Sequence, residues 1–147
     1  MKKMIMMLAM VFTLSTMYAF TGEEAVSKQA VSNFTTQFKG ATAPNWTAGK
    51  NYYKVAFSLN AQKLFAYYNI DGDFIAVSRY ISSFQLPLYL QTSLKNDYSK
   101  YWVTDLFEMA DNNETTFYVT VENADAKIVL KSTDGKAWSV FDRSKKV

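Results

Sequence analysis

The sequence predicts an α+β fold of two tandem α-β-β-β-β units that share one antiparallel sheet, with both helices packed on one face. Three observations predict it. Short motifs recur at a fixed offset, each half opens with apolar residues at four-residue spacing, and alternating extended segments joined by tight turns follow each opening. A fixed period in a sequence indicates a repeated structural unit.

The offset between the two units is 63 residues. Two dipeptides occur once in each half at this separation: Asn60-Ala61 with Asn123-Ala124, and Asp71-Gly72 with Asp134-Gly135. The units predicted from them span residues 23–81 and 84–143. Since each helix could cover only one face of its strands, we expect both units to form a single domain at residues 20–147.

The first 19 residues have the three regions of a secretory signal peptide. Lys2 and Lys3 supply positive charge, an apolar run from Met4 to Leu14 follows, and small residues lead to Ala19. The chain contains no Cys, so neither a lipid-modified junction nor a disulfide is available. We therefore expect a periplasmic or secreted protein, with no stable membrane insertion after the signal at 1–19 is removed.

Each unit is predicted to begin with a helix. In the first, Thr21 and Glu24 have the spacing of a capping box, and Gly40 ends the helix. Its apolar stripe is formed by Val26, Ala30, Phe34 and Phe38. In the second, Pro87 suits the first helical turn, where its missing N–H has no partner to lose. The matching stripe is formed by Leu90, Leu94 and Tyr98.

Four extended segments are predicted after each helix. They are residues 45–48, 52–59, 63–70 and 73–81, then 102–110, 115–122, 126–132 and 136–142. Asp71-Gly72 and Asp134-Gly135 separate the third and fourth segments of each set, and Asp-Gly is a strong hairpin signal because tight turns need positive φ. The second unit is longer, and the turn at 111–113 is where the extra residues are expected.

The order and spacing of several segments resemble a known group of proteins. The segments are residues 38–42, 45–46, 52–57 and 67–72 in the first half, and 86–87, 118–121 and 133–136 in the second. They are similar to the PepSY-like, beta-lactamase-inhibitor-like (BLIP-like) proteins that Gram-negative bacteria export, over residues 23–143. The resemblance implies a tandem repeat in one sheet, a periplasmic location and no assigned activity. Beta-lactamase inhibitory protein, a relative in fold, binds an enzyme with the concave face of its sheet.

Composition excludes most catalytic chemistry. The chain has no His and no Cys, which removes the common bases, thiol nucleophiles and zinc ligands. Asp71 and Asp73 are the nearest carboxylate pair, and a hairpin turn explains them more simply. Without Lys2 and Lys3, 16 − 2 = 14 basic residues face 13 acidic ones, so no nucleic-acid partner is expected. We expect no catalytic residue, no metal and no cofactor.

The unusual feature is aromatic: 10 Tyr, 11 Phe and 3 Trp. Alternation places one set of side chains toward the helices: Tyr53, Val55, Phe57, Leu64, Ala66, Tyr68, Ile75 and Val77. It places another set on the uncovered face: Tyr52, Phe65, Tyr67, Phe74 and Tyr80. These rings are the candidate binding face, although they could instead only pack across strands. Trp46, Trp102 and Trp138 are expected in the core.

Two functions follow as hypotheses. The first is a non-catalytic, inhibitor-like module that engages a protein of the cell envelope through the uncovered sheet face. The alternative is a carrier of a small apolar or glycan ligand. An enzyme that uses only carboxylates is the least favoured.

Overall fold

The structure is a computed structural model that describes residues 20–21 and 26–146. The predicted signal peptide at 1–19 lies outside the described residues. The elements follow in this order: β1 (Phe20–Thr21), α2 (Lys28–Gln37), β2 (Thr42–Ala48), β3 (Tyr52–Leu59), β4 (Gln62–Asn69), β5 (Phe74–Tyr80), the 3-10 turn η3 (Ser83–Gln85), α3 (Leu88–Asp97), β6 (Trp102–Ala110), β7 (Thr115–Glu122), β8 (Ala126–Ser132) and β9 (Ser139–Lys145).

The described strands form one antiparallel sheet. Their order across the sheet is their order in the chain, from β1 to β9. β1 contributes only two residues, so the sheet consists mainly of eight longer strands, four after each helix. The antiparallel sheet with two helices is therefore confirmed, while the internal repeat stays a prediction from the sequence.

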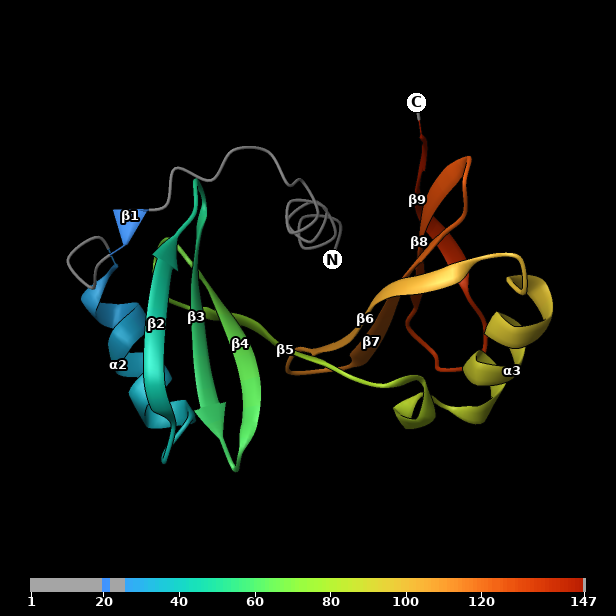
Figure 1. Cartoon of the computed structure of the whole chain (residues 1–147). Helices are drawn as coiled ribbons and strands as arrows, with labels where there is room; N and C mark the ends of the chain where they lie inside the picture. Colours follow the sequence, from blue (N-terminus) through green and yellow to red (C-terminus); the bar gives the residue numbers. More distant parts are fainter. Residues whose placement is uncertain (1–19, 22–25, 147) are drawn as a thin grey trace.

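Strand register places both helices on the same face of the sheet. Val55, Ala66, Val77 and Ala110 are successive pairing partners across β3, β4, β5 and β6. Val55 and Ala66 pack in the α2 core, and Leu106, which shares its face of β6 with Ala110 by alternation, packs in the α3 core. In Figure 1 the sheet bends at the β5–β6 junction, with α2 outside one half and α3 outside the other. The face without these helices thus lies inside the bend.

Helix α2 begins later than the capping box predicted. It starts at Lys28, and the hydroxyl of Ser27 accepts a hydrogen bond from the Ala30 amide at 3.1 Å. Thr21 instead pairs with Thr47 as part of β1, so the assignment of Thr21 as the cap is wrong. Ser27 is the cap because it immediately precedes the first helical residue, Lys28, where its hydroxyl reaches the free N–H groups of the first turn. The stripe is confirmed: Ala30 and Phe34 are buried against Trp46 and Phe57.

Helix α3 covers the second half in the same manner. Leu90 is fully buried with Leu106, Val119 and Leu130, and Leu94 and Tyr98 pack at the edge of this cluster. Pro87 is the residue before the helix and not within its first turn. The indole N–H of Trp138 donates to the carbonyl oxygen of Leu90 at 3.1 Å, which ties β9 to the helix.

Each Asp-Gly turn rests against the start of a helix. Gly72 has φ +91°, and a Cβ added there would lie 2.6 Å from the backbone nitrogen of Ala30. Its carbonyl oxygen accepts a 2.8 Å hydrogen bond from the side chain of Asn33. Gly135 has φ +69° and faces Pro87 at the start of α3. Glycine is therefore required at position 72 both for backbone conformation and for close approach to the helix.

Candidate binding face

The sheet face opposite the helices has a hydrophobic cluster of its own. Its buried members come from five consecutive strands, β4 to β8: Tyr67, Ala76, Met109, Tyr118 and Val129. Tyr52, Phe65, Ile75, Phe107 and Phe141 pack around them. The cluster crosses the β5–β6 junction and therefore lines the inside of the bend that Figure 1 shows.

Seven rings on this face form what we call the aromatic band: Tyr52, Phe65, Tyr67, Tyr80, Phe107, Tyr118 and Phe141. Five of them make an unbroken series of ring contacts from β4 to β9. The successive centroid distances along Phe65, Tyr80, Phe107, Tyr118 and Phe141 are 5.8, 6.4, 5.1 and 5.7 Å. Tyr52 and Tyr67 add a further pair at 6.3 Å. Such spacings are those of favourable aromatic pairs, so the band is a continuous apolar surface shared by both halves.

The structure brings four of the five predicted face residues together. Tyr52, Phe65, Tyr67 and Tyr80 lie in the aromatic band. Phe74 does not: it packs in the α2 core, 5.8 Å from Tyr68 and 6.2 Å from Phe38.

A bulge explains the error at Phe74. The β4–β5 register shifts between Tyr67 and Tyr68, which inverts the alternation at the start of β5. The same shift moves Ile75 from the predicted helix side to the opposite cluster. Val77, beyond the bulge, faces α2 as predicted.

Three members of the band were missed by the sequence analysis: Phe107, Tyr118 and Phe141. A signal for Tyr118 was present in the sequence, because the apolar residues Phe117, Val119 and Val121 alternate along segment 115–122 and alternation turns Tyr118 to the face opposite them. No local pattern could have joined Phe107 to Tyr80, since their contact depends on the pairing of β5 with β6 across the two halves.

Exposure differs sharply along the band. Tyr67 is 7% exposed and Tyr118 is fully buried, whereas Tyr80 is 65% exposed. Phe65, Phe107 and Phe141 are half-buried. The centre of the band therefore acts as a packed floor, and Tyr80 presents its ring to solvent above the junction of the two halves.

Lysines lie over the rings in both halves. Lys54 is the direct cross-strand partner of Tyr67, and Lys131 is that of Tyr118. The Lys54 ammonium lies 4.6 Å from the centroid of Phe65 and 5.9 Å from that of Tyr67, and the Lys131 ammonium lies 5.8 Å from Tyr118. The Lys63 ammonium lies 5.7 Å from the centroid of Phe65. The aromatic floor therefore carries positive charge at its surface.

Burial disfavours the ionised form of two phenols of the band. Burial raises the pKa of Tyr67 above its usual range, and the Ser78 hydroxyl donates to its phenolic oxygen at 3.5 Å. Burial raises the pKa of Tyr118 as well. Both phenols stay protonated at neutral pH, so neither supplies a nucleophile or a base.

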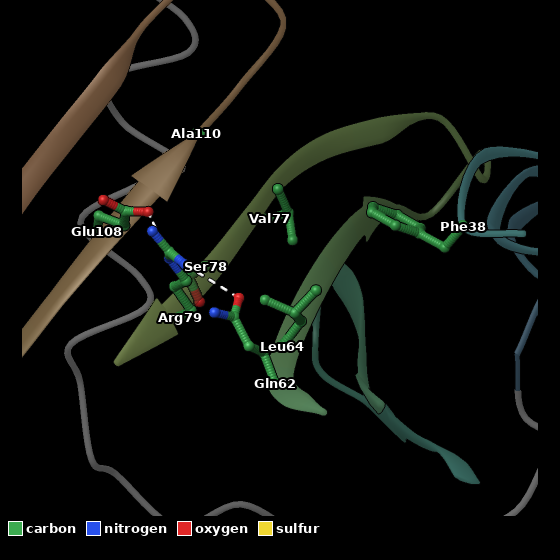
Figure 2. Close-up of a pocket in the computed structure, with 8 residues that line it drawn as sticks. All are labelled: Phe38, Gln62, Leu64, Val77, Ser78, Arg79, Glu108 and Ala110. Carbon is green, nitrogen blue, oxygen red and sulfur yellow. Dashed lines mark hydrogen bonds and ion pairs between the residues drawn. The ribbon is translucent and has the colours of Figure 1, made fainter. Parts of the chain in front are cut away.

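A small pocket lies on the helix side of the β5–β6 junction. Its volume is about 220 Å³, and Phe38, Leu64, Val77 and Ala110 supply its apolar walls. Figure 2 shows Arg79 between Glu108 and Gln62 at the mouth. The Nε of Arg79 donates to Glu108 at 2.6 Å and a terminal nitrogen donates to Gln62 at 3.0 Å. The charged groups of the pocket are thus satisfied by one another.

Within the described residues, no cluster of three or more His, Cys, Asp or Glu side chains could hold a metal. Across that same part of the chain, no helix combines the length and apolar character that crossing a membrane requires.

Asp73 belongs to the predicted turn. Its backbone amide donates to the side-chain oxygen of Asn69 at 2.8 Å, and its carboxylate accepts from the side-chain nitrogen of Asn69 at 3.3 Å.

The three tryptophans do not share one environment. Trp46 is buried in the α2 core and Trp138 is half-buried beside α3. Trp102 is 53% exposed, with the Lys146 ammonium 5.2 Å from its ring, so its assignment to the core is wrong. Trp102 pairs with Glu122 at the start of β6, and alternation puts Glu122 on the face opposite Val121, which packs in the α3 core.

Solved structures resemble this fold across most of their length. A BLIP-like protein from Bacteroides fragilis aligns with a TM-score of 0.68 and 20% identity, covering 82% of this chain and 86% of that one. A DUF2874 family protein from Bacteroides ovatus aligns with a TM-score of 0.70 and 15% identity, over 82% and 87%. The fold is BLIP-like.

A third similar structure, described as a candidate periplasmic protein from Bacteroides eggerthii, aligns with a TM-score of 0.69 and 13% identity over 82% and 88% of the two chains. No family model matches this chain, and a search of curated proteins gives no match either. At these identities the likeness concerns the fold, and the function has to be argued from the aromatic band.

Proposed function

We propose that this chain is an exported, non-catalytic module that binds a protein partner in the cell envelope through the aromatic band. The observation that carries the proposal is the position of Tyr80. It is 65% exposed, and its ring contacts Phe65 of the first half and Phe107 of the second. Rigid rings that offer large contact area at low entropic cost are enriched at protein interfaces.

The location of the rings supports binding of a convex partner. They line the inside of a bent sheet whose other face is covered by α2 and α3. The packed floor of Tyr67 and Tyr118 needs no rearrangement before it meets a partner, which limits the ordering entropy of association. The BLIP-like fold agrees with this use of the face.

An exported location is supported by three observations. The signal-peptide pattern covers residues 1–19, the resemblance to PepSY-like proteins points to the periplasm, and one similar structure is described as a candidate periplasmic protein. The turn geometry at Asp73 and the neutral phenols support a non-catalytic role.

Site-specific photo-cross-linking tests this proposal. A photoreactive amino acid replaces Tyr80 in one variant and Tyr89 in another. Tyr89 is 72% exposed on α3 and serves as the matched control. In the native host, we expect a discrete protein adduct from position 80 and none from position 89. The proposal fails if position 80 gives no adduct, or gives the same adducts as position 89.

The carrier alternative is less well supported. The pocket of about 220 Å³ is smaller than the roughly 300–1,000 Å³ of most small-molecule sites, and its Arg79 is already paired with Glu108. Native mass spectrometry of the protein purified from its host distinguishes the two functions, because a carrier would retain a bound small molecule.

A further inference from the structure

Among the residues that the structure describes, no recorded ion pair includes a lysine of the aromatic band. Among the described residues, the recorded ion pairs are Arg79 with Glu108, and Lys127 and Lys146 with Glu122. Lys54, Lys63 and Lys131 take part in none of them. Lys54 and Lys63 both lie near the Phe65 ring and Lys131 lies near the Tyr118 ring, so the face carries three positive charges.

Two lysines of the first half, Lys54 and Lys63, both lie near the ring of Phe65. Lys54 and Lys63 approach Phe65 at 4.6 and 5.7 Å. Burial, and secondly the charge of Lys63, lower the pKa of Lys54. Two like charges held beside a half-buried ring are mutually unfavourable, and a negative group placed between them would relieve the repulsion.

No carboxylate of the described residues forms a recorded ion pair with Lys54 or Lys63. Glu122 is bonded by Lys146 at 2.6 Å, and Asp105 pairs with Thr120 across the strands and lies near Tyr80, where burial and secondly the Asp105 charge raise the pKa of the phenol. Lys127 is their other charged neighbour. The recorded ion pairs of the described carboxylates therefore involve Arg79, Lys127 and Lys146, and none of them involves Lys54 or Lys63.

We infer that the partner presents an acidic segment to this face, with carboxylates beside Lys54, Lys63 and Lys131 and an apolar side chain against Tyr80 and Phe107. This inference rests on the proposed binding function and specifies the chemistry of the partner. The lysines of the two halves flank the rings, so one segment that crosses the junction contacts both charge and ring surfaces. A flat lipid surface is a poor fit, because the lysines and rings lie inside the bend.

The test uses a defined probe: a short synthetic peptide with glutamates on both sides of one leucine, and a version with glutamine in place of each glutamate. Affinity is followed by NMR titration of the purified protein. We expect the glutamate peptide to bind, with shifts in residues of the band, and the glutamine peptide to bind several-fold more weakly. Equal binding of both peptides overturns the inference.

Matched lysine variants locate the effect. The double variant Lys54→Gln/Lys63→Gln is compared with Lys28→Gln/Lys95→Gln, which removes the same charge from exposed positions on α2 and α3. Two partly exposed ion pairs correspond to about a 5- to 10-fold loss of affinity in the first variant. The second should change affinity by less than about twofold. An equal loss in both variants overturns the inference, as does equally tight binding of a single-stranded oligonucleotide of the same charge.

The same variants separate this inference from the proposed function. If the Tyr80 cross-link forms, but neither the glutamate peptide nor Lys54→Gln/Lys63→Gln reduces it, the binding face stands and the acidic partner is wrong. If the cross-link is absent while the peptide binds through the lysines, the charge inference stands and the proposed protein partner fails.

Discussion

Replacement of Gly72 by alanine should destabilise the protein far more than replacement of Gly40. The two glycines have nearly the same backbone conformation, with φ +91° and +86°. Alanine at either position incurs the left-handed strain of about 1 kcal/mol, partly offset by about 0.4–1 kcal/mol from a less flexible unfolded chain. Gly40→Ala should therefore lower the free energy of unfolding by only about 1 kcal/mol or less.

The surroundings distinguish the two positions. A Cβ at Gly40 would meet only the Leu59 side chain at 3.8 Å, an ordinary contact. At Gly72 it would lie 2.6 Å from the Ala30 nitrogen and 3.0 Å from the Gln29 carbonyl carbon, so the turn must move away from α2. Overpacking of this kind costs about 1–3 kcal/mol, and loss of the 2.8 Å bond from Asn33 adds about 1 kcal/mol. We expect Gly72→Ala to exceed Gly40→Ala by about 2–4 kcal/mol.

Urea unfolding followed by tryptophan fluorescence measures the difference, because Trp46 lies in the α2 core. Thermal unfolding should agree, with a midpoint about 10 °C lower for Gly72→Ala than for Gly40→Ala in a domain of this size. Equal destabilisation by both substitutions would refute the close packing of this turn on the helix, whatever its absolute size.

Three other predictions concern single substitutions with defined outcomes. Ser27→Ala should reduce the free energy of unfolding by about 1 kcal/mol because it removes the cap of α2, whereas Thr21→Ala should leave it nearly unchanged; the reverse order in urea unfolding would restore Thr21 as the cap. Burial raises the pKa of Asp105, so its ionised form opposes folding; Asp105→Asn should stabilise the protein at neutral pH, and the gain should vanish as the pH falls below the carboxyl's usual range. Glu108→Gln should cost less than about 1 kcal/mol, a loss that shrinks in high salt, because the Arg79 pair is partly exposed.

Sequence patterns predicted the bounds of the strands well, but predicted less well on which face of the sheet each side chain lies. The predicted segments 52–59, 102–110, 115–122 and 126–132 coincide with β3, β6, β7 and β8, because alternation and turn residues are local properties. The face of Phe74 could not be predicted, since it depends on a bulge opposite Tyr67 and Tyr68 that leaves no mark in the alternation of either strand.

The start of α2 and the full extent of the aromatic band also could not be predicted from the sequence. Thr21 matches the sequence pattern of a helix cap, but in the structure it pairs with Thr47 as part of a strand. Which of the two Thr21 does depends on tertiary contacts, which the local sequence does not show. Phe107 joins the band through its pairing with Tyr80, and Phe141 lies at the register shift of β9 against β8. The candidate face was therefore predicted in its first half and completed by the structure in its second.

Because every strand pairs only with strands adjacent in the chain, sheet formation never has to wait for a distant segment to arrive. Pairing of this local kind favours rapid folding. A polypeptide threaded through a translocation channel amino terminus first would present α2 and β2–β5 before the later strands, and the aromatic core of Phe34, Trp46 and Phe57 could close while the remainder is still in transit. Each new strand would then add to an edge already in place.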